Sequence, residues 1–473
     1  MTTRRSFILS GLAAGLSARA FASSPLQNIA AAECRIEPDQ LRQRMDGFGA
    51  SGAFFQARLL QHYPMAERTR ILDLLFSPVR GAGLSIVRNL IGDGGNWGNK
   101  FNGPTPSIEP RPGVWNWQGD DDQIWLMRAA ARRGCTRFMS TAWSPPAWMK
   151  TNHNVVGGQL RTECYQDYAE YLAQYVLGYQ KRHRLAIYAV SPQNEPDVTV
   201  KYSSCYWDAG QYHRFFRDHL VPLFTRHRIP THLILGEDSN WSDAICRPTL
   251  NDPASAAGVG IVAAHAYAGD NHVPKVPISA RTGYFSTAFG HHKQVWQTEV
   301  SAFNPNDASM ADGLYWAKLV HYHLAQDQVS GWLYWWLVSG GPNREALISL
   351  DPASQGWLPN RRLFTLGQYS RFIRPGDVRL EATHNPMPGV FTSAYQIAAG
   401  NRKKIAVVAI NENPQPSRIR FILPGGARAL NGWRTSMFEE LRPVGMFFGL
   451  GVRNADGWLC ELMPHSVTTF VAG

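Results

Sequence analysis

The chain has 473 residues, of which 44% are hydrophobic and 18% charged, a composition that excludes an intrinsically disordered protein. This length is too great for one small core and suits a large barrel joined to an accessory domain. The net charge of +11 favours anionic partners, but apart from Lys403 and its neighbours no cationic run indicates a nucleic-acid-binding surface.

Residues 1–22 predict an export signal. Arg4 and Arg5 form a twin-arginine pattern, an apolar run follows at residues 8–16, and Ala20 and Ala22 offer a small-x-small cleavage site. The apolar run is too short to remain across a bilayer, and no later stretch of the sequence reaches that length. We therefore expect cleavage after Ala22 and a periplasmic or secreted bacterial protein without stable membrane insertion. A buried N-terminal helix is the alternative.

The six cysteines are an even number, which permits disulfides in an exported protein. Export after folding in the reducing cytosol weakens that expectation. None of the cysteines has C-x-x-C spacing, so a thiolate metal site is not indicated. His321 and His323 lack any ligand pattern and are interpreted as packing or surface residues.

Residues 23–44 are interpreted as an N-terminal strand that joins a side domain. Residues 45–52, rich in glycine, predict the first strand of a barrel and its turn. Residues 84–91 predict the second strand, in which Arg88 interrupts an apolar run. Because a buried arginine needs a partner, we expect a carboxylate near the barrel mouth, with a purely structural salt bridge as the alternative. Asp93 follows in a polar, Gly-rich loop.

Helices and strands then alternate along the chain. Helices are predicted over residues 65–76, 121–133, 166–183, 209–228 and 309–324, and further strands over residues 136–141, 233–236, 261–264 and 331–337. Gly134 is placed to end one helix, and Asp208 to cap the start of another. Two prolines make residues 143–150 a rigid loop after the third strand.

Two of the strands end in a glutamate. The fourth runs into Asn194-Glu195-Pro196, and the seventh, which starts near Val295, runs into Glu299. A strand that delivers a carboxylate at its C-terminal end, twice, is how a β/α barrel builds an active site. Two carboxylates that face one pocket are what the cleavage of a glycosidic bond requires. The alternative is that both are ordinary loop acids. Glu237 and Asp238 could compete for this role, but they lack the flanking pattern.

The sixth strand presents His265 and Tyr267 one residue apart and therefore on the same face. A tyrosine hydroxyl that bonds a nucleophilic carboxylate would hold it ionised. Altogether, eight predicted strands alternate with helices over residues 45–372, which is the pattern of a closed parallel TIM (β/α)8 barrel.

Beyond residue 372 the hydrophobic pattern of the sequence changes from helical to β-type. Helical periodicity is nearly absent, and alternating β-type runs occur at residues 390–398, 404–411, 418–423 and 467–471. This pattern predicts an antiparallel β-sandwich over residues 373–473 that packs on the barrel. A separable carbohydrate-binding module is the alternative, but it needs a flexible linker, and none is visible before residue 376.

The motif Asn194-Glu195-Pro196 resembles the acid/base motif of the large barrel clan of retaining β-glycosidases, clan A. Almost the whole chain after the leader resembles glycoside hydrolase family 30, which includes glucosylceramidases, xylanases and β-1,6-glycanases. The resemblance implies that Glu195 is the acid/base and Glu299 the nucleophile, and that both belong to a double-displacement mechanism. It also implies substrate-binding roles for Asn194, Arg88, Trp143, His265, Tyr267 and Trp335, whereas a contact of Asp93 with sugar hydroxyls is a weaker interpretation.

We therefore predict an exported retaining hydrolase of β-linked glycans of the xylan or β-1,6-glucan or galactan type. The alternatives are a glucosylceramidase-like exo-β-glucosidase and, in a different class, a non-catalytic carbohydrate-binding protein. No metal, nucleotide or other cofactor is implied, and the sequence contains no phosphate-binding Gly-rich loop. We expect a monomer. Arg344, after the eighth strand, could bind a uronate of glucuronoxylan, although the residues around it do not closely match the subfamily that cleaves this glycan.

Overall fold

The computed structural model describes residues 31–54, 56–96, 104–269, 276–303, 306–341, 345–400, 402–423, 430–447 and 457–472. The predicted leader and Arg344 lie outside the described residues. Within the described ranges, none of the helices combines the length and the apolar character needed to cross a bilayer.

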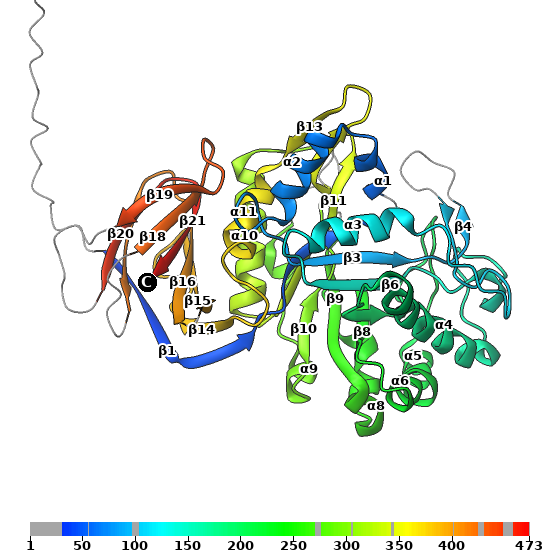
Figure 1. The fold of residues 1–473 in the computed structure, drawn as a ribbon. Coiled ribbons are helices and arrows are strands. Elements are labelled where there is room, and N and C mark those ends of the chain that lie inside the picture. The colour runs from blue at the N-terminus through cyan, green and yellow to red at the C-terminus, as the bar shows by residue number, and fades with distance from the viewer. Residues whose placement is uncertain are drawn as a thin grey trace, which may run out of the picture. The chain divides into compact units, whose positions relative to one another are not determined.

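The larger part of the chain, from β2 onward, forms a closed barrel of parallel strands (Figure 1). Its strands are β2 (Gly47–Ser51), β3 (Ile86–Ile91), β6 (Arg137–Ala142), β7 (Ala189–Ser191), β8 (His232–Asn240), β9 (Val259–Tyr267), β10 (Gln294–Gln297) and β11 (Gly331–Gly340). Each pairs with the next, and Gly331 of β11 lies opposite both Trp296 of β10 and Gly47 of β2, which closes the ring. The predicted TIM barrel is confirmed.

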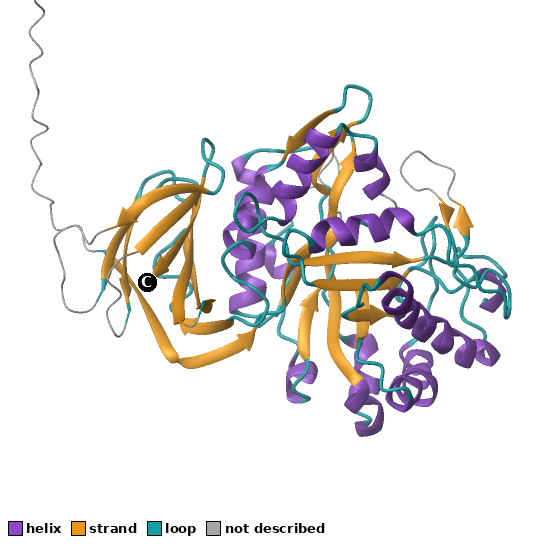
Figure 2. Cartoon of the chain, viewed as in Figure 1, coloured by secondary structure: helices purple, strands orange, loops and turns teal. Residues whose placement is uncertain are grey.

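Helices follow the barrel strands along the chain and lie outside them (Figure 2). They are α1 (Gln56–Gln61), α2 (Met65–Phe76), α3 (Asp121–Ala131), α4 (Tyr165–Gly178), α5 (Ala209–Phe215), α6 (Val221–Arg226), α7 (Arg247–Leu250), α8 (Pro253–Gly258), α9 (Ser286–Gly290), α10 (Met310–Ala325) and α11 (Arg361–Ser370). The predicted cap is present: Asp208 accepts a hydrogen bond of 2.8 Å from the Gln211 backbone, and the Gln211 side chain accepts one from Asp208.

The barrel interior is packed, not hollow. Apolar side chains from the strands fill it, among them Ile86, Met139, Ile261 and Leu333, all fully buried. At the N-terminal end of the strands, Asp46 accepts hydrogen bonds from the Trp296 indole at 2.8 Å and the Ser330 hydroxyl at 2.7 Å. Because this end is closed by side chains, polar chemistry is left to the C-terminal ends of the strands.

Among the described residues, nine strands form the side domain. They are β1 (Ala32–Arg44), β14 (Val378–Ala382), β15 (Val390–Ala399), β16 (Arg402–Asn411), β17 (Ser417–Ile422), β18 (Leu430–Thr435), β19 (Arg442–Phe447), β20 (Trp458–Leu462) and β21 (Ser466–Ala472). β1 joins two halves of a curled sheet, since its start pairs with β17 and its end with β14. The halves enclose a core that includes Leu380, Phe421 and Phe470. The predicted antiparallel sandwich is confirmed, except that the β1–β17 pair is parallel. The domain boundaries stay predictions.

Side chains of α10 and α11 join the barrel to this sheet. Gln368 of α11 donates to the Thr435 hydroxyl at 2.9 Å, and its backbone carbonyl accepts from Thr469 at 2.6 Å. Lys318 of α10 forms an ion pair with Glu412 at 2.7 Å.

All six cysteines are buried and unpaired, so the disulfides that the sequence permits are not formed. The short strands β4 (Gly95–Asn96), β5 (Pro104–Thr105), β12 (Ala346–Asp351) and β13 (Gly356–Pro359) decorate the barrel loops.

Of the two interpretations offered for His321 and His323 of α10, packing holds and surface does not, since both are fully buried. The Trp332 indole donates to His323 Nδ1 at 3.0 Å, and the other ring nitrogen lies 2.8 Å from the Arg281 carbonyl, an arrangement that suits a neutral ring. His321 packs against Phe391 at 5.6 Å between ring centroids and has no hydrogen-bond partner among the described residues. Burial lowers the pKa of each histidine to about 3.

We expect the protein to lose stability as the pH falls below 6.5. The unfolded chain protonates these histidines near pH 6.5 and the folded chain only near pH 3, so the unfolded state binds more protons in between, at a cost of up to ~1.4 kcal/mol per pH unit for each ring. His321→Phe should make the free energy of unfolding less dependent on pH between 6.5 and 5. Urea unfolding at several pH values measures this, with the exposed His292→Gln as the control. Equal pH dependence in wild type and His321→Phe would contradict the expectation.

Candidate active site

Glu195 and Glu299 meet at the C-terminal end of the barrel. Glu195 lies four residues after the end of β7, and Glu299 lies two residues after the end of β10. One carboxylate oxygen of each lies within 4.8 Å of the other, and a ring nitrogen of His265 lies within the same distance of both. The geometry therefore allows both carboxylates to reach one bound molecule.

The backbone around Glu195 is unusual and firmly held. Its φ of +46° is in the left-handed region, which a residue with a side chain occupies only when its surroundings demand it. The Glu195 amide donates to the Glu237 carbonyl at 3.0 Å, and the neighbouring Asn194 amide donates to the Ala142 carbonyl at 2.7 Å. These bonds to the two adjacent strands aim the Glu195 side chain over the barrel mouth.

Arg88 of β3 lies beneath the two glutamates, fully buried. Its guanidinium donates to Glu299 Oε2, to Asn194 Oδ1 at 2.6 Å and to Glu237 Oε1 at 3.3 Å. The ring of Trp143 stands 4.6 Å from the guanidinium carbon. The buried arginine expected from the sequence thus has carboxylate partners at the barrel mouth, and a planar fork is needed to reach three oxygens at once.

Tyr267 and His265 of β9 complete the cluster from one face of that strand. The Tyr267 hydroxyl donates to Glu299 Oε1 at 3.0 Å. His265 Nδ1 lies 3.1 Å from Glu195 Oε1, and its other nitrogen lies 3.7 Å from Glu237 and 3.8 Å from Glu299. Burial disfavours a charged ring here, but the three glutamates outweigh it and raise the pKa of His265 to about 10. The surrounding carboxylates therefore favour the protonated ring of His265.

The carboxylates of the cluster differ in how they hold a proton. Burial raises the pKa of Glu299, and although His265 and Arg88 oppose this effect, the net shift is upward. For Glu237 burial also acts upward, but Arg88 and His265 prevail and lower its pKa to about 2. Glu237 is thus an anion, whereas burial shifts Glu299 toward its protonated form.

A cavity of about 440 Å³ opens over Glu195 and Glu299. Aromatic side chains make up much of its lining, among them Phe54, Trp143, Tyr202, Tyr267, Phe303, Trp335 and Trp336. Trp335 and Trp336 stack at 5.0 Å with 23° between their planes. Flat apolar faces beside carboxylates are suited to sugar rings, which present C–H groups on one side and hydroxyls around the edge. Trp143 and Trp335 therefore lie where the sequence analysis expects a sugar.

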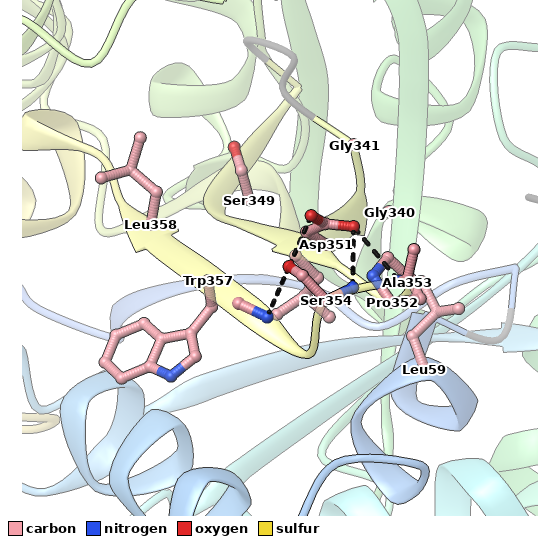
Figure 3. A pocket seen from close by; sticks show the side chains of 12 residues that line it. Leu59, Gly340, Gly341, Ser349, Asp351, Pro352, Ala353, Ser354, Trp357 and Leu358 are labelled. Atoms are coloured by element: carbon pink, nitrogen blue, oxygen red, sulfur yellow. Dashed lines mark hydrogen bonds between the residues drawn. The ribbon is translucent and has the colours of Figure 1, made fainter.

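A larger cavity of about 900 Å³ lies beside the β12–β13 hairpin, between that hairpin, Gly340 and Leu59 (Figure 3). Its carboxylate, Asp351, is bonded within its own turn to Ser354 at 2.6 Å and to the Ala353 amide at 3.1 Å. Glu195 and Glu299 do not line it. The smaller cavity is therefore the candidate active site.

Some residues lie elsewhere than the sequence analysis indicated. Asp93 is buried and accepts from the Gly95 amide at 2.8 Å and the Thr105 hydroxyl at 2.5 Å, so it braces the loop after β3 and does not line the cavity. Its sugar contact stays a prediction. Glu345, which the sequence analysis did not select, lines the cavity, and burial together with Glu299 raises its pKa to about 7.

Glu237 is the other residue that sequence reasoning set aside. It is fully buried within the cluster, although it lacks the motif that marks Glu195. Its place at the C-terminal end of the fifth barrel strand was the available signal, since catalytic groups in such barrels come from several strand ends.

The chain is similar to known glycoside hydrolases along most of its length. Residues 45–347 match the family model described as Glycosyl hydrolase family 59. The glucuronoxylanase XynC of Bacillus subtilis is 28% identical over 367 residues, 75% of this chain and 77% of that protein. An endo-1,6-beta-D-glucanase of Neurospora crassa is 22% identical over 80% of each chain. The structure of a glycoside hydrolase family 30 subfamily 8 xylanase from Clostridium acetobutylicum superposes with a TM-score of 0.75 at 26% identity, covering 93% of this chain and 99% of that one.

Proposed function

The chain belongs to the glycoside hydrolases: it matches the model of glycosyl hydrolase family 59 and, like its solved relatives, is a member of glycoside hydrolase family 30. From this membership we propose that it is an exported retaining hydrolase of β-linked glycans. The carrying observation is the separation of the Glu195 and Glu299 oxygens, within 4.8 Å. Retaining enzymes place their two carboxyl groups about 5–5.5 Å apart, whereas inverting enzymes leave about 6.5–9.5 Å for a water molecule. Export rests on the twin-arginine pattern of residues 1–22.

In the first step Glu299 attacks the anomeric carbon of the sugar while Glu195 gives its proton to the oxygen of the leaving group. The bond from the anomeric carbon to that oxygen breaks, and a covalent glycosyl ester of Glu299 forms. In the second step Glu195 takes a proton from water, whose oxygen attacks the same carbon and releases Glu299. Two inversions at one carbon give net retention.

The hydrogen bonds at Glu299 support its role as the nucleophile. Glu299 accepts from Arg88 and from the Tyr267 hydroxyl, and a protonated Glu299 would weaken both of these bonds. Glu195 accepts from His265 through one oxygen, which leaves the other to carry a proton toward the cavity. The mechanism requires the proton on Glu195 and an ionised Glu299, and the two donors to Glu299 favour its charged form.

Asn194, Trp335 and Trp143 are the further residues that we assign to sugar binding. Asn194 is fixed by Arg88 at 2.6 Å, which leaves its amide nitrogen to bond the 2-hydroxyl, a contact that strengthens in the transition state. Trp335 offers a ring on which the sugar stacks, and Trp143 supports it at 5.9 Å between centroids.

Tyr267→Phe tests the support of the nucleophile. The change removes a hydrogen bond of 3.0 Å to Glu299 and keeps the ring, which stacks on Phe303. A hydrogen bond to a charged group contributes about 1.5–3 kcal/mol, so kcat/KM should fall roughly 10- to 100-fold. Loss of a donor to the charged form also raises the pKa of Glu299, so the acidic limb of the pH–rate profile should move to higher pH. An unmoved limb with full activity would contradict this role.

The direct test of the proposed function is hydrolysis of a panel that contains xylan, glucuronoxylan, β-1,6-glucan, β-1,6-galactan and aryl β-glycosides, with products sized by chromatography. We expect oligosaccharides from one of the polysaccharides. Release of single glucose units would support the glucosylceramidase-like exo-β-glucosidase instead. A protein that binds a glycan but hydrolyses none of the panel would support the non-catalytic carbohydrate-binding protein.

A further inference from the structure

Glu237 takes part in the site through both its backbone and its side chain. Its carbonyl accepts from the Glu195 amide at 3.0 Å, and its carboxylate lies 3.3 Å from Arg88 and 3.7 Å from His265. It has no solvent exposure and does not line the cavity over Glu195 and Glu299. Glu237 is therefore within reach of the partners of both glutamates but out of reach of a substrate.

The fold directs this side chain inward by a local irregularity. The pairing of β8 with β9 shifts between Gly236 and Asp238, which lie opposite the consecutive residues Ala263 and Ala264. Glu237 is the extra residue of this bulge and has a φ of +70°. Bulges beside active sites re-aim side chains, and a strained backbone at a non-glycine residue persists only where the surrounding structure demands it.

The charges around Glu237 come from several elements. Arg88 of β3 and His265 of β9 are cations, while Ser191 of β7 and Tyr212 of α5 are neutral neighbours. With Glu195 protonated, the buried cluster contains two positive charges, Arg88 and His265, and two negative charges, Glu237 and Glu299. The sum is zero. Without the charge of Glu237 the sum would be +1, and a positive surrounding favours loss of the Glu195 proton.

We propose that Glu237 is a positioning residue: it is the counter-ion that keeps Arg88 and His265 charged while Glu195 retains the proton it must donate. The inference rests on the proposed roles of Glu195 and Glu299. It predicts that the charge of Glu237, not its shape, sets the pH range in which the acid works.

Glu237→Gln tests this, since it keeps the shape and removes the charge. We expect the basic limb of the kcat/KM profile to move to lower pH by about one unit or more. At neutral pH, activity on a polysaccharide should fall about 10- to 100-fold. A dinitrophenyl β-glycoside, whose leaving group needs no proton, should lose far less. Glu237→Asp keeps the charge and should keep the basic limb near its wild-type position at reduced rate. A purely structural role would lower activity in both variants without moving the limb.

A second measurement needs no variant of Glu237. In wild-type protein with ¹⁵N-labelled histidine, assigned with His265→Gln, the His265 ring should still be an imidazolium at pH 8. A neutral His265 at pH 7, or an unmoved limb in Glu237→Gln, overturns the inference. If Glu237→Gln does not fold, the histidine signal decides alone. If Glu299→Gln remains active, the proposed function itself is wrong. If Glu299→Gln is inactive and only the limb is unmoved, the inference alone fails.

Discussion

Glu299→Gln should lower kcat/KM by about 10⁴-fold or more on every substrate, because an amide cannot form the glycosyl ester. The substitution keeps the volume of the side chain and an oxygen that can accept from Arg88 or Tyr267, so the fold should not change. Initial rates on an aryl β-glycoside and on the polysaccharide identified from the panel measure the effect.

Glu345→Gln is the matched control, because Glu345 lines the same cavity and the change is chemically identical. It should lose far less activity. With Glu299→Ala, added azide can enter the space left by the carboxylate and should restore activity by forming the α-glycosyl azide. Activity of Glu299→Gln within tenfold of wild type would contradict the assignment of Glu299 as the nucleophile.

Glu195→Gln should have the second largest effect, and its size should depend on the leaving group. A polysaccharide needs a proton on its departing oxygen, so its hydrolysis should slow about 10²- to 10⁴-fold. A dinitrophenyl β-glycoside does not need that proton, so the first step should remain fast. The second step lacks its base, so the glycosyl-enzyme should accumulate and a burst of dinitrophenol should precede slow turnover.

Stopped-flow absorbance on the two kinds of substrate separates these steps within one protein. The basic limb of the wild-type pH profile should also disappear, since it reports the proton of Glu195. With Glu195→Ala, azide should form the β-glycosyl azide, because it attacks the covalent intermediate from the side that water normally uses. Equal losses on good and poor leaving groups would contradict the acid/base role of Glu195.

The barrel could be predicted from the sequence because its signals are local. The apolar spacing of residues 65–76 coincides with the bounds of α2, and Asp208 caps its helix as expected. The pairing of β1 with β17 could not be predicted, because residues far apart in the chain meet there and no local pattern selects parallel pairing. The helix predicted over residues 166–183 is present as α4, which is followed directly by a π-helical turn at Tyr179–His183.

The site was predictable where a residue type has few structural alternatives. A buried Arg88 demands carboxylates, and Asn194-Glu195-Pro196 at a strand end has few ordinary uses. Glu237 lacks the flanking pattern of Glu195, and the bulge that turns its side chain toward Arg88 is not visible in the sequence. Glu345 follows β11 in a loop without periodicity, so only the folded chain shows that it reaches the cavity. For Asp93 the polar loop around it suggested a sugar contact, whereas in the folded chain its carboxylate is buried and accepts a hydrogen bond from the Gly95 amide.

The central claim is that two neighbouring carboxylates act in succession on one carbon, and the configuration of the first product tests it most directly. Proton NMR during hydrolysis of a good β-glycoside substrate records which anomer is released before mutarotation mixes the two. We predict that the β-anomer appears first and the α-anomer only later. Release of the α-anomer first would mean that water attacks the sugar directly, and the double displacement at Glu299 would be wrong.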